Sequence, residues 1–127
     1  MNRVLIVDDS LLQQKVLSAI VEDEGYEALT AGSGSDALEM LEAQHIDCLI
    51  LDLLMPEMGG MQVLEALQTR NLQLPVIVVS ADIQEWVRTS CLELGVKEFL
   101  TKPVKQEGLC AALKNAILNP EEHAPCH

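Results

Sequence analysis

Short aliphatic runs that end at carboxylates constrain this chain more than any other feature. Val4–Val7 is followed at once by Asp8 and Asp9, and Cys48–Leu51 is followed by Asp52. Continuous apolar runs of this kind are typical of parallel strands that are buried on both faces. Because chemistry in open α/β sheets gathers beyond the carboxyl ends of the strands, the pattern predicts that the carboxylates share one site. Such oxygen donors favour a hard divalent cation, and one of them can be the nucleophile that carries a phosphoryl group.

Strand and helix patterns alternate five times, which predicts an α/β fold with a parallel sheet, right-handed crossovers and helices on both faces. The strands are predicted at residues 3–8, 26–31, 47–52, 75–80 and 97–101. The helices are predicted from Ser10 to Gly25, through Ala37 and Leu41, through Met61 and Leu67, from near Asp82 to Gly95, and from about Lys105 to Leu118.

Mostly apolar residues that recur at helical spacing mark three of these helices. The residues that recur in the first helix are Leu12, Val16, Ala19, Ile20 and Asp23. The fourth helix repeats Ile83, Val87, Cys91 and Leu94, and the residues expected to face inward from the last helix are Leu109, Leu113, Ala116 and Ile117. Each helix is therefore expected to pack one stripe against the sheet.

Length and composition indicate one domain. The chain has 127 residues, which is enough for a single core. Aromatic residues make up 2% against a hydrophobic fraction of 49%, so the core must be aliphatic. We expect residues 1–119 to form the domain. Residues 120–127 are expected to be a short disordered tail, because Pro120 and Pro125 interrupt any helix there.

The charge and the terminal residues exclude several classes of protein. A net charge of −12 argues against a nucleic-acid surface, which needs clustered Lys and Arg, so any direct output should go to another protein. Because Met1-Asn2-Arg3 runs straight into a predicted strand, we expect no secretory signal. No apolar run approaches the roughly 18–20 residues of a membrane span. We expect a cytoplasmic protein without membrane contact.

The cysteines give no sign of a metal site or of disulfide bonds. Cys48, Cys91, Cys110 and Cys126 show no C-x-x-C spacing. They are expected to be small apolar residues in a reducing compartment. His123, Cys126 and His127 could in principle hold a metal, but a disordered tail is favoured.

Four segments together point to a known family. They are Leu-Ile-Val-Asp-Asp-Ser at 5–10, Leu-Asp-Leu-Leu-Met-Pro at 51–56, Val-Ser-Ala at 79–81 and Leu-Thr-Lys-Pro at 100–103. Each segment alone is weak evidence for a family, whereas all four in this order and spacing are a highly specific signal. With them, residues 3–118 resemble the receiver domain of two-component response regulators. The resemblance implies a flavodoxin-like, doubly wound (βα)5 fold whose five-stranded parallel sheet has the strand order 2-1-3-4-5.

The resemblance implies a role for each acidic residue. Asp52 is expected to be the phosphoacceptor, whose carboxylate attacks a phosphoryl group to form an acyl phosphate. Asp8 and Asp9 are expected to hold Mg²⁺, Asp9 directly and Asp8 mostly through water. Asp52 and the backbone carbonyl of Leu54 would complete the ligand set. Crowding of these carboxylates should raise the pKa of Asp52 when no ion is bound.

Lys102, Ser80 and Phe99 complete the expected site. The Lys102 ammonium would neutralise phosphoryl oxygens together with the metal, and the Ser80 hydroxyl would hydrogen-bond one of them. Phe99 stands where the family has an aromatic residue whose rotamer follows that hydroxyl. The resemblance also implies a cis Lys102–Pro103 peptide bond, although trans has the higher base rate for such bonds.

Simpler roles stay open for each of these residues taken alone. Asp9 or Ser10 can cap the first helix, and Ser80 can cap the fourth. Phe99 can be a plain core aromatic, and an isolated Lys102 would normally be a solvated charge. Explaining the whole set in this way requires four coincidences at four strand ends, which favours a site.

Trp86 and Leu54 give two further expectations. Trp86 lies one step off the apolar stripe of the fourth helix, and the resemblance places it on the surface of the fourth helix, fifth strand and fifth helix, which commonly docks partners. There it would be an exposed anchor, or it would partly fill a groove between helices. Leu54 has an apolar side chain that cannot orient water, so slow self-hydrolysis of the acyl phosphate is a further hypothesis.

The sequence therefore predicts a phosphorylation-dependent switch that catalyses only its own phosphorylation and dephosphorylation. Its expected partners are a histidine kinase or a histidine phosphotransfer protein and a downstream target protein. Because nine residues follow Leu118, we expect no effector domain after the receiver. A relay intermediate and a receiver excised from a longer regulator are the alternatives.

Two rivals come from other classes. An aspartyl-phosphate hydrolase would carry an Asp-x-Asp pattern after the first strand, whereas Asp8 and Asp9 are adjacent. A flavin-binding electron carrier would need a Ser/Thr/Gly-rich phosphate loop at that place, and the acidic pair would repel phosphate. Both are therefore less favoured than the switch.

Overall fold

The computed structural model describes residues 2–55, 58–81 and 84–118. Its strands are β1 (Arg3–Val7), β2 (Glu27–Ala31), β3 (Cys48–Asp52), β4 (Val76–Ser80) and β5 (Glu98–Thr101). Its helices are α1 (Leu11–Asp23), α2 (Gly34–Ala43), α3 (Gly60–Thr69), α4 (Glu85–Glu93) and α5 (Gln106–Leu118). Each observed strand lies within its predicted range, so the predicted alternation of strands and helices is confirmed.

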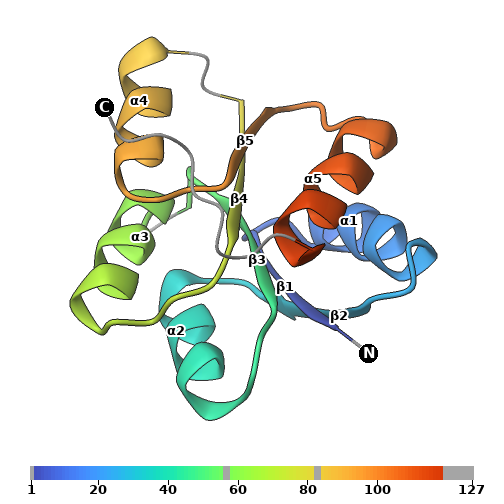
Figure 1. The fold of residues 1–127 in the computed structure, drawn as a ribbon, viewed down its shortest axis with the longest axis horizontal. Helices are drawn as coiled ribbons and strands as arrows, with labels where there is room; N and C mark the ends of the chain where they lie inside the picture. Colours follow the sequence, from blue (N-terminus) through green and yellow to red (C-terminus); the bar gives the residue numbers. More distant parts are fainter. Residues whose placement is uncertain (1, 56–57, 82–83, 119–127) are drawn as a thin grey trace.

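The strands form one parallel sheet in the order β2-β1-β3-β4-β5, as predicted (Figure 1). The register pairs Val7 with Leu51, Asp52 with Val79, and Ser80 with Thr101. The carboxyl ends of β1, β3, β4 and β5 are therefore nearly level at one edge. Whatever follows these four strands must meet there.

Helices cover both faces of the sheet. In Figure 1, α1 and α5 lie on one side, and α2, α3 and α4 lie on the other. Ile6 and Ile50 belong to the apolar cluster under α1 and α5, whereas Val7 and Leu51 belong to the cluster on the opposite face. Burial on both faces explains why the strand sequences are continuous rather than alternating.

Local chemistry sets the helix ends. The Ser10 hydroxyl accepts a hydrogen bond from the Gln13 amide at 3.2 Å and caps α1, which confirms one of the simpler roles considered for that residue. Gly25 and Gly95, just beyond α1 and α4, adopt φ of +89°, a region in which glycine has no steric cost. Both helices therefore end where the sequence predicts.

The inward face of α1 differs from the stripe noted in the sequence. The residues that α1 buries are Gln14, Leu17 and Val21, while Leu12 and Val16 are 73% and 45% exposed. This helix carries apolar residues on more than one face, so spacing alone selected the wrong one. The polar side chain of Gln14 is thus in the interior, and the aliphatic side chains of Leu12 and Val16 are on the surface.

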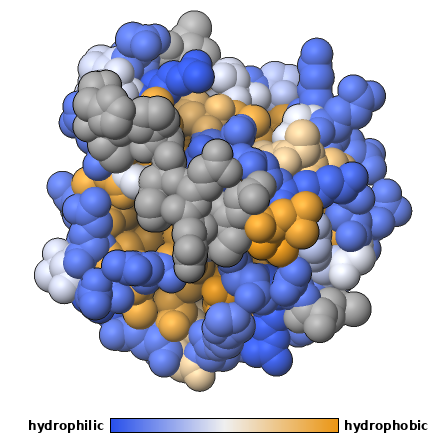
Figure 2. Space-filling view, in the orientation of Figure 1, coloured by the Kyte–Doolittle hydropathy of each residue, from blue (hydrophilic) through white to orange (hydrophobic). Residues whose placement is uncertain are grey.

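Some expectations fall on residues that the structure does not describe. The fourth helix was expected from near Asp82 and through Ile83, which lie outside the described residues, and α4 is described from Glu85 onward. The tail at 120–127 also lies outside them. In the ranges that are described, no helix has both the length and the hydropathy to cross a bilayer. Hydrophilic residues dominate the face seen in Figure 2, in keeping with the net charge.

Asp47 ties the amino ends of β1 and β3 together. Its Oδ2 accepts a hydrogen bond from the Arg3 backbone amide at 2.8 Å, and its own amide donates to the Arg3 carbonyl at 2.9 Å. His45 Nε2 lies 2.8 Å from Asp47 Oδ1. Burial raises the pKa of Asp47, but the Arg3 and His45 contacts outweigh it and hold that pKa below its usual value.

We expect Asp47→Ala to lower the free energy of unfolding at neutral pH by about 1–2 kcal/mol, because the Arg3 amide loses its carboxylate acceptor. A carboxyl group with a depressed pKa stabilises the fold above its unfolded pKa and loses that effect as the pH falls through the folded value. The difference between wild-type protein and variant should therefore shrink below about pH 4. Urea unfolding at neutral and acidic pH tests this, and an equal difference at both would contradict the charge effect.

Candidate functional site

Three carboxylates meet at the carboxyl edge of the sheet. Asp8, Asp9 and Asp52 each offer an oxygen, and these oxygens lie within 4.8 Å of one another. Asp8 and Asp52 are buried, while Asp9 is exposed. The Ser10 amide donates to Asp8 Oδ1 at 2.9 Å, and the Leu54 amide donates to Asp52 Oδ1 at 3.3 Å. The structure thus brings together the three residues that the strand ends predicted.

The chemistry of this donor set fits Mg²⁺. All three groups are carboxylates, which are hard oxygen ligands, and the exposure of Asp9 leaves room for the water ligands that Mg²⁺ retains. A site made of these oxygens is poorly suited to soft metals, which prefer thiolate and thioether ligands. The predicted part of the Leu54 carbonyl as a fourth ligand stays a prediction.

Lys102 extends into the acidic cluster. Its Nζ lies 3.4 Å from Asp8 Oδ2 and 3.5 Å from Asp52 Oδ1, and its side chain is 22% exposed. The peptide bond to Pro103 is cis, as the resemblance implies, and the Lys102 amide donates to the Ser80 carbonyl at 2.8 Å. Lys102 is therefore a counter-ion shared by two buried carboxylates, so its simpler role as a solvated charge is wrong.

Burial dominates the ionisation of Asp52. Loss of solvent raises the pKa of this carboxyl group, the Lys102 ammonium lowers it, and the negative charge of Asp8 raises it again. The net result is a pKa above the usual value, in the predicted direction. Ionised Asp52 is thus held at a cost to the fold, which a bound cation would offset.

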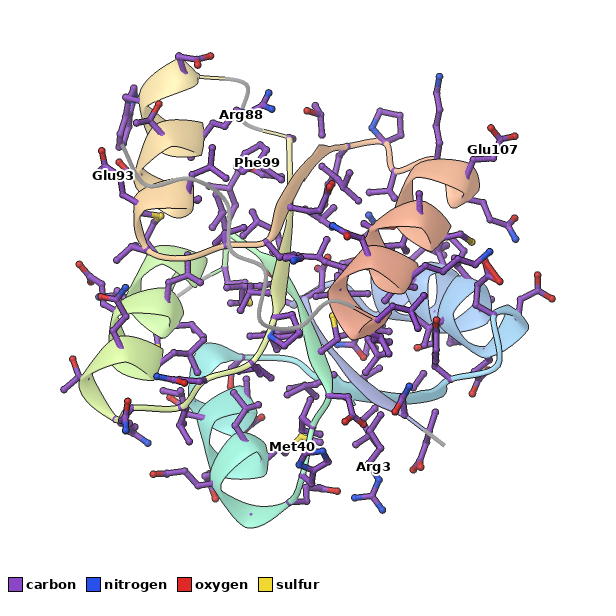
Figure 3. The ribbon with its side chains drawn as sticks, in the orientation of Figure 1. Arg3, Met40, Arg88, Glu93, Phe99 and Glu107 are labelled. Atoms are coloured by element: carbon purple, nitrogen blue, oxygen red, sulfur yellow. The ribbon has the colours of Figure 1, made fainter. Side chains whose placement is uncertain are left out.

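Ser80 and Phe99 lie on β4 and β5, the two strands that follow β3 in the sheet. Ser80 is fully buried at the end of β4, one residue beyond Val79, which pairs with Asp52 across the sheet. Gln84 is the N-cap of α4 as described, so Ser80 does not cap that helix. Phe99 is partly buried on the side of β5 that faces α4 (Figure 3). Both positions are compatible with the predicted switch, and Phe99 also packs against the core.

Trp86 is exposed at the start of α4. Its side chain is 65% exposed, and the indole Nε1 donates to Gln84 Oε1. The alternative in which it fills a groove between helices is therefore wrong.

Leu54 is 62% exposed beside the acidic cluster. An apolar side chain thus stands at the approach to Asp52, as the hypothesis on hydrolysis requires.

Gln14 is a residue that the sequence reasoning missed. It is buried on the inner face of α1, and its Nε2 donates to the Asp8 carbonyl at 2.7 Å. A signal existed, because Gln14 falls in the same helical stripe as Leu17 and Val21. A lone polar residue in an inward stripe marks a hydrogen bond that the interior must supply.

A parallel sheet with an acidic cluster and a lysine at the carboxyl ends of its strands defines a class of α/β proteins suited to cation-assisted phosphoryl transfer. Residues 4–114 match the family model of the response regulator receiver domain. The chain belongs to this family, the phosphorylation-dependent signalling domain of two-component systems. The predicted family and fold are thereby confirmed.

Curated relatives agree with this assignment. The chain is 38% identical over 118 residues to the transcriptional regulatory protein CpxR of Escherichia coli, covering 93% of this chain and 50% of that protein. It is 30% identical over 124 residues to the alkaline phosphatase synthesis transcriptional regulatory protein PhoP of Bacillus subtilis, covering 98% of this chain and 52% of that protein. The chain thus spans about half the length of these relatives.

Solved structures of similar length share the fold. The chemotaxis protein CheY4 of Vibrio cholerae has a TM-score of 0.84 and 29% identity, covering 91% of this chain and 98% of the other. The response regulator TrrA of Thermotoga maritima, solved in complex with Mg(2+)-BeF, has a TM-score of 0.83 and 27% identity, covering 91% and 99%. Both support the same arrangement of strands and helices.

Proposed function

We propose that this protein is a cytoplasmic switch whose Asp52 accepts a phosphoryl group from a histidine kinase or a histidine phosphotransfer protein. The observation that carries the proposal is the convergence of Asp8, Asp9 and Asp52 with the Lys102 ammonium, 3.5 Å from the Asp52 carboxylate. A carboxylate and a phosphoryl donor are both anions, so attack requires positive charge at this place.

Asp8 and Asp9 would hold Mg²⁺, together with Asp52 and the backbone carbonyl of Leu54. The bound ion would stabilise the charge on the phosphoryl oxygens. The acidic donor set supports this, as does the similar TrrA, whose structure contains Mg(2+)-BeF. Asp8, held by the Ser10 amide, would keep its carboxylate oriented without rearrangement.

Lys102 and Ser80 would act on the phosphoryl group once it is attached. The ammonium already lies beside Asp8 and Asp52, so it needs little movement to pair with a new anion. Ser80, on the strand next to that of Asp52, would donate its hydroxyl proton to a phosphoryl oxygen. Phe99, which packs between β5 and α4, would repack in response and alter the neighbouring surface.

The rim of the site favours a protein as phosphodonor. Leu11 and Leu12, which follow the acidic pair and Ser10, are 72% and 73% exposed, and Leu54, two residues after Asp52, is 62% exposed. Aliphatic side chains that are exposed near an acidic site favour contact with another protein over contact with a small phosphomonoester. This observation supports the switch over the hydrolase.

Output would proceed through the surface of α4, β5 and α5, where Trp86 is exposed. A rigid, exposed tryptophan is a typical anchor for a downstream target protein. The second candidate is the same switch acting within a longer regulator, favoured by the greater length of CpxR and PhoP.

Intact-mass analysis after incubation with acetyl phosphate tests the proposal. A phosphoryl adduct should form in Mg²⁺ and should be absent when EDTA removes the ion. An adduct of equal yield in EDTA would contradict cation-assisted attack. No adduct under either condition, and none with a histidine phosphotransfer protein as donor, would refute the phosphoacceptor itself.

We expect Asp9→Ala to weaken Mg²⁺ binding at least about tenfold, because the exposed carboxylate of the cluster is removed. Calorimetric titration with MgCl₂ measures the dissociation constant. Adduct formation should recover at high Mg²⁺ concentration. Glu93→Ala, which removes an exposed carboxylate at the far end of α4, is the matched control and should leave the constant unchanged. Equal weakening in both variants would point to net charge rather than ligation.

A further inference from the structure

The buried polar side chains of the described residues are Asp8, Gln14, Asp52 and Ser80. Three of them stand at strand ends in the candidate site, whereas Gln14 lies on the inner face of α1 beside Leu17. An apolar residue would fill this place without the desolvation cost of an amide. Packing alone therefore does not explain why a glutamine stands at position 14.

The reason is visible in the contacts of the Asp8 backbone. Gln14 Nε2 donates to the Asp8 carbonyl at 2.7 Å in the interior, while the Asp8 amide donates to the Ala31 carbonyl at 3.1 Å. One contact comes from a helix and the other from the neighbouring strand β2. The backbone of Asp8 is thus held at its amide by β2 and at its carbonyl by α1.

One hydrogen bond to this carbonyl orients two carboxylates. The peptide unit is planar and contains the carbonyl of Asp8 together with the Cα atoms of both Asp8 and Asp9. When Gln14 fixes the carbonyl, it fixes the plane from which both side chains depart. The Ser10 amide then fixes Asp8 Oδ1, so the acidic pair is oriented before any ion arrives.

We propose that Gln14 is the positioning residue of the acidic pair and that it sets the Mg²⁺ affinity of the site. This inference rests on the proposed function, in which Asp8 and Asp9 hold the ion. Gln14 touches neither the ion nor the phosphoryl group. It acts through the Asp8–Asp9 peptide, as outer partners do that orient metal ligands and change affinity by roughly 10–100-fold.

Gln14→Met isolates the hydrogen bond, because methionine has a similar length and no donor. The Mg²⁺ dissociation constant, measured by calorimetric titration, should rise about tenfold. The rise in unfolding midpoint on adding saturating Mg²⁺ to the wild-type protein should be correspondingly smaller in the variant at equal Mg²⁺ concentration. Gln14→Asn keeps an amide that is too short to reach Asp8 and should show the same loss, which covers a methionine variant that does not fold.

Val21→Ala is the matched control, since it removes buried volume from the same face of α1. It should lower the unfolding midpoint without Mg²⁺ and leave the dissociation constant unchanged. An unchanged constant in the Gln14 variants would overturn the inference and leave Gln14 a structural residue. Absence of Mg²⁺ binding by the wild-type protein would instead refute the proposed function, so the two failures are distinguishable.

Discussion

Asp52→Asn should abolish phosphoryl uptake while the protein stays folded. Asparagine has nearly the shape of aspartate, and its amide oxygen can still accept the Leu54 hydrogen bond. It is not a nucleophile, so the rate of adduct formation should fall by more than about a thousandfold. Intact-mass analysis with acetyl phosphate and Mg²⁺ measures this loss. Phosphoryl uptake at the wild-type level would show that another residue is the acceptor.

The same substitution should stabilise the protein at neutral pH. Burial raises the pKa of Asp52, so the folded state holds its ionised form less readily than the unfolded chain does. A carboxyl group of this kind costs stability as the pH rises from the unfolded pKa through the folded pKa, and the full cost remains above both. Asparagine removes that cost.

Thermal unfolding without Mg²⁺ tests whether Asp52→Asn raises or lowers the stability of the protein. The midpoint of Asp52→Asn should exceed that of the wild-type protein at pH 7, and the two should converge below about pH 4, where Asp52 is protonated in both states. Glu93→Gln, which changes an exposed carboxylate on α4, should show no such gain. A less stable Asp52→Asn at pH 7 would mean that the pairing with Lys102 outweighs burial.

Gly60→Ala should both destabilise the protein and displace Asp52, the proposed phosphoacceptor. A Cβ at Gly60 would lie 2.7 Å from the Asp52 carbonyl oxygen and 2.7 Å from the Leu53 Cα. Both are backbone atoms, so the start of α3 or the end of β3 must shift. Overpacking of this kind costs about 1–3 kcal/mol. The shift would move the peptide that carries Asp52, so phosphorylation should slow as well.

Gly108→Ala is a control for which we expect the opposite change in stability. Gly108 is also in the first turn of a helix, α5, and no atom lies within 4 Å of a Cβ placed there. Alanine should therefore stabilise the protein by about 0.5–1 kcal/mol. Urea unfolding of both variants separates close packing from helix propensity. A gain in stability for Gly60→Ala would show that α3 can move away without cost.

The main elements of the site could be predicted because they depend on strand ends. Asp8, Asp9, Asp52 and Ser80 follow aliphatic runs, Lys102 follows the short strand Glu98–Thr101, and parallel register brings such positions to one edge. The order of the strands and the role of each residue came from the resemblance to the receiver family. The cis peptide before Pro103 came from the resemblance and not from local preference, which favours trans.

The inner face of α1 could not be predicted in this way. Leu12 and Val16 are apolar and regularly spaced, yet they are exposed, because the sheet contacts the stripe that holds Leu17 and Val21. Gln14 was missed for the same reason. Its spacing with Leu17 and Val21 signals that it is buried, but its partner, the Asp8 carbonyl, follows only from the tertiary structure.

Lys102 directly follows β5, which is the least buried strand of the sheet. β5 is an edge strand of four residues, and none of them is fully buried, whereas every residue of β3 is. Elements with few buried contacts open locally at free energies well below that of global unfolding. The amides of β5 should therefore exchange with solvent deuterium faster than those of β3. Each opening would withdraw the ammonium from the carboxylates, so the charge balance of the site would fluctuate on its own timescale.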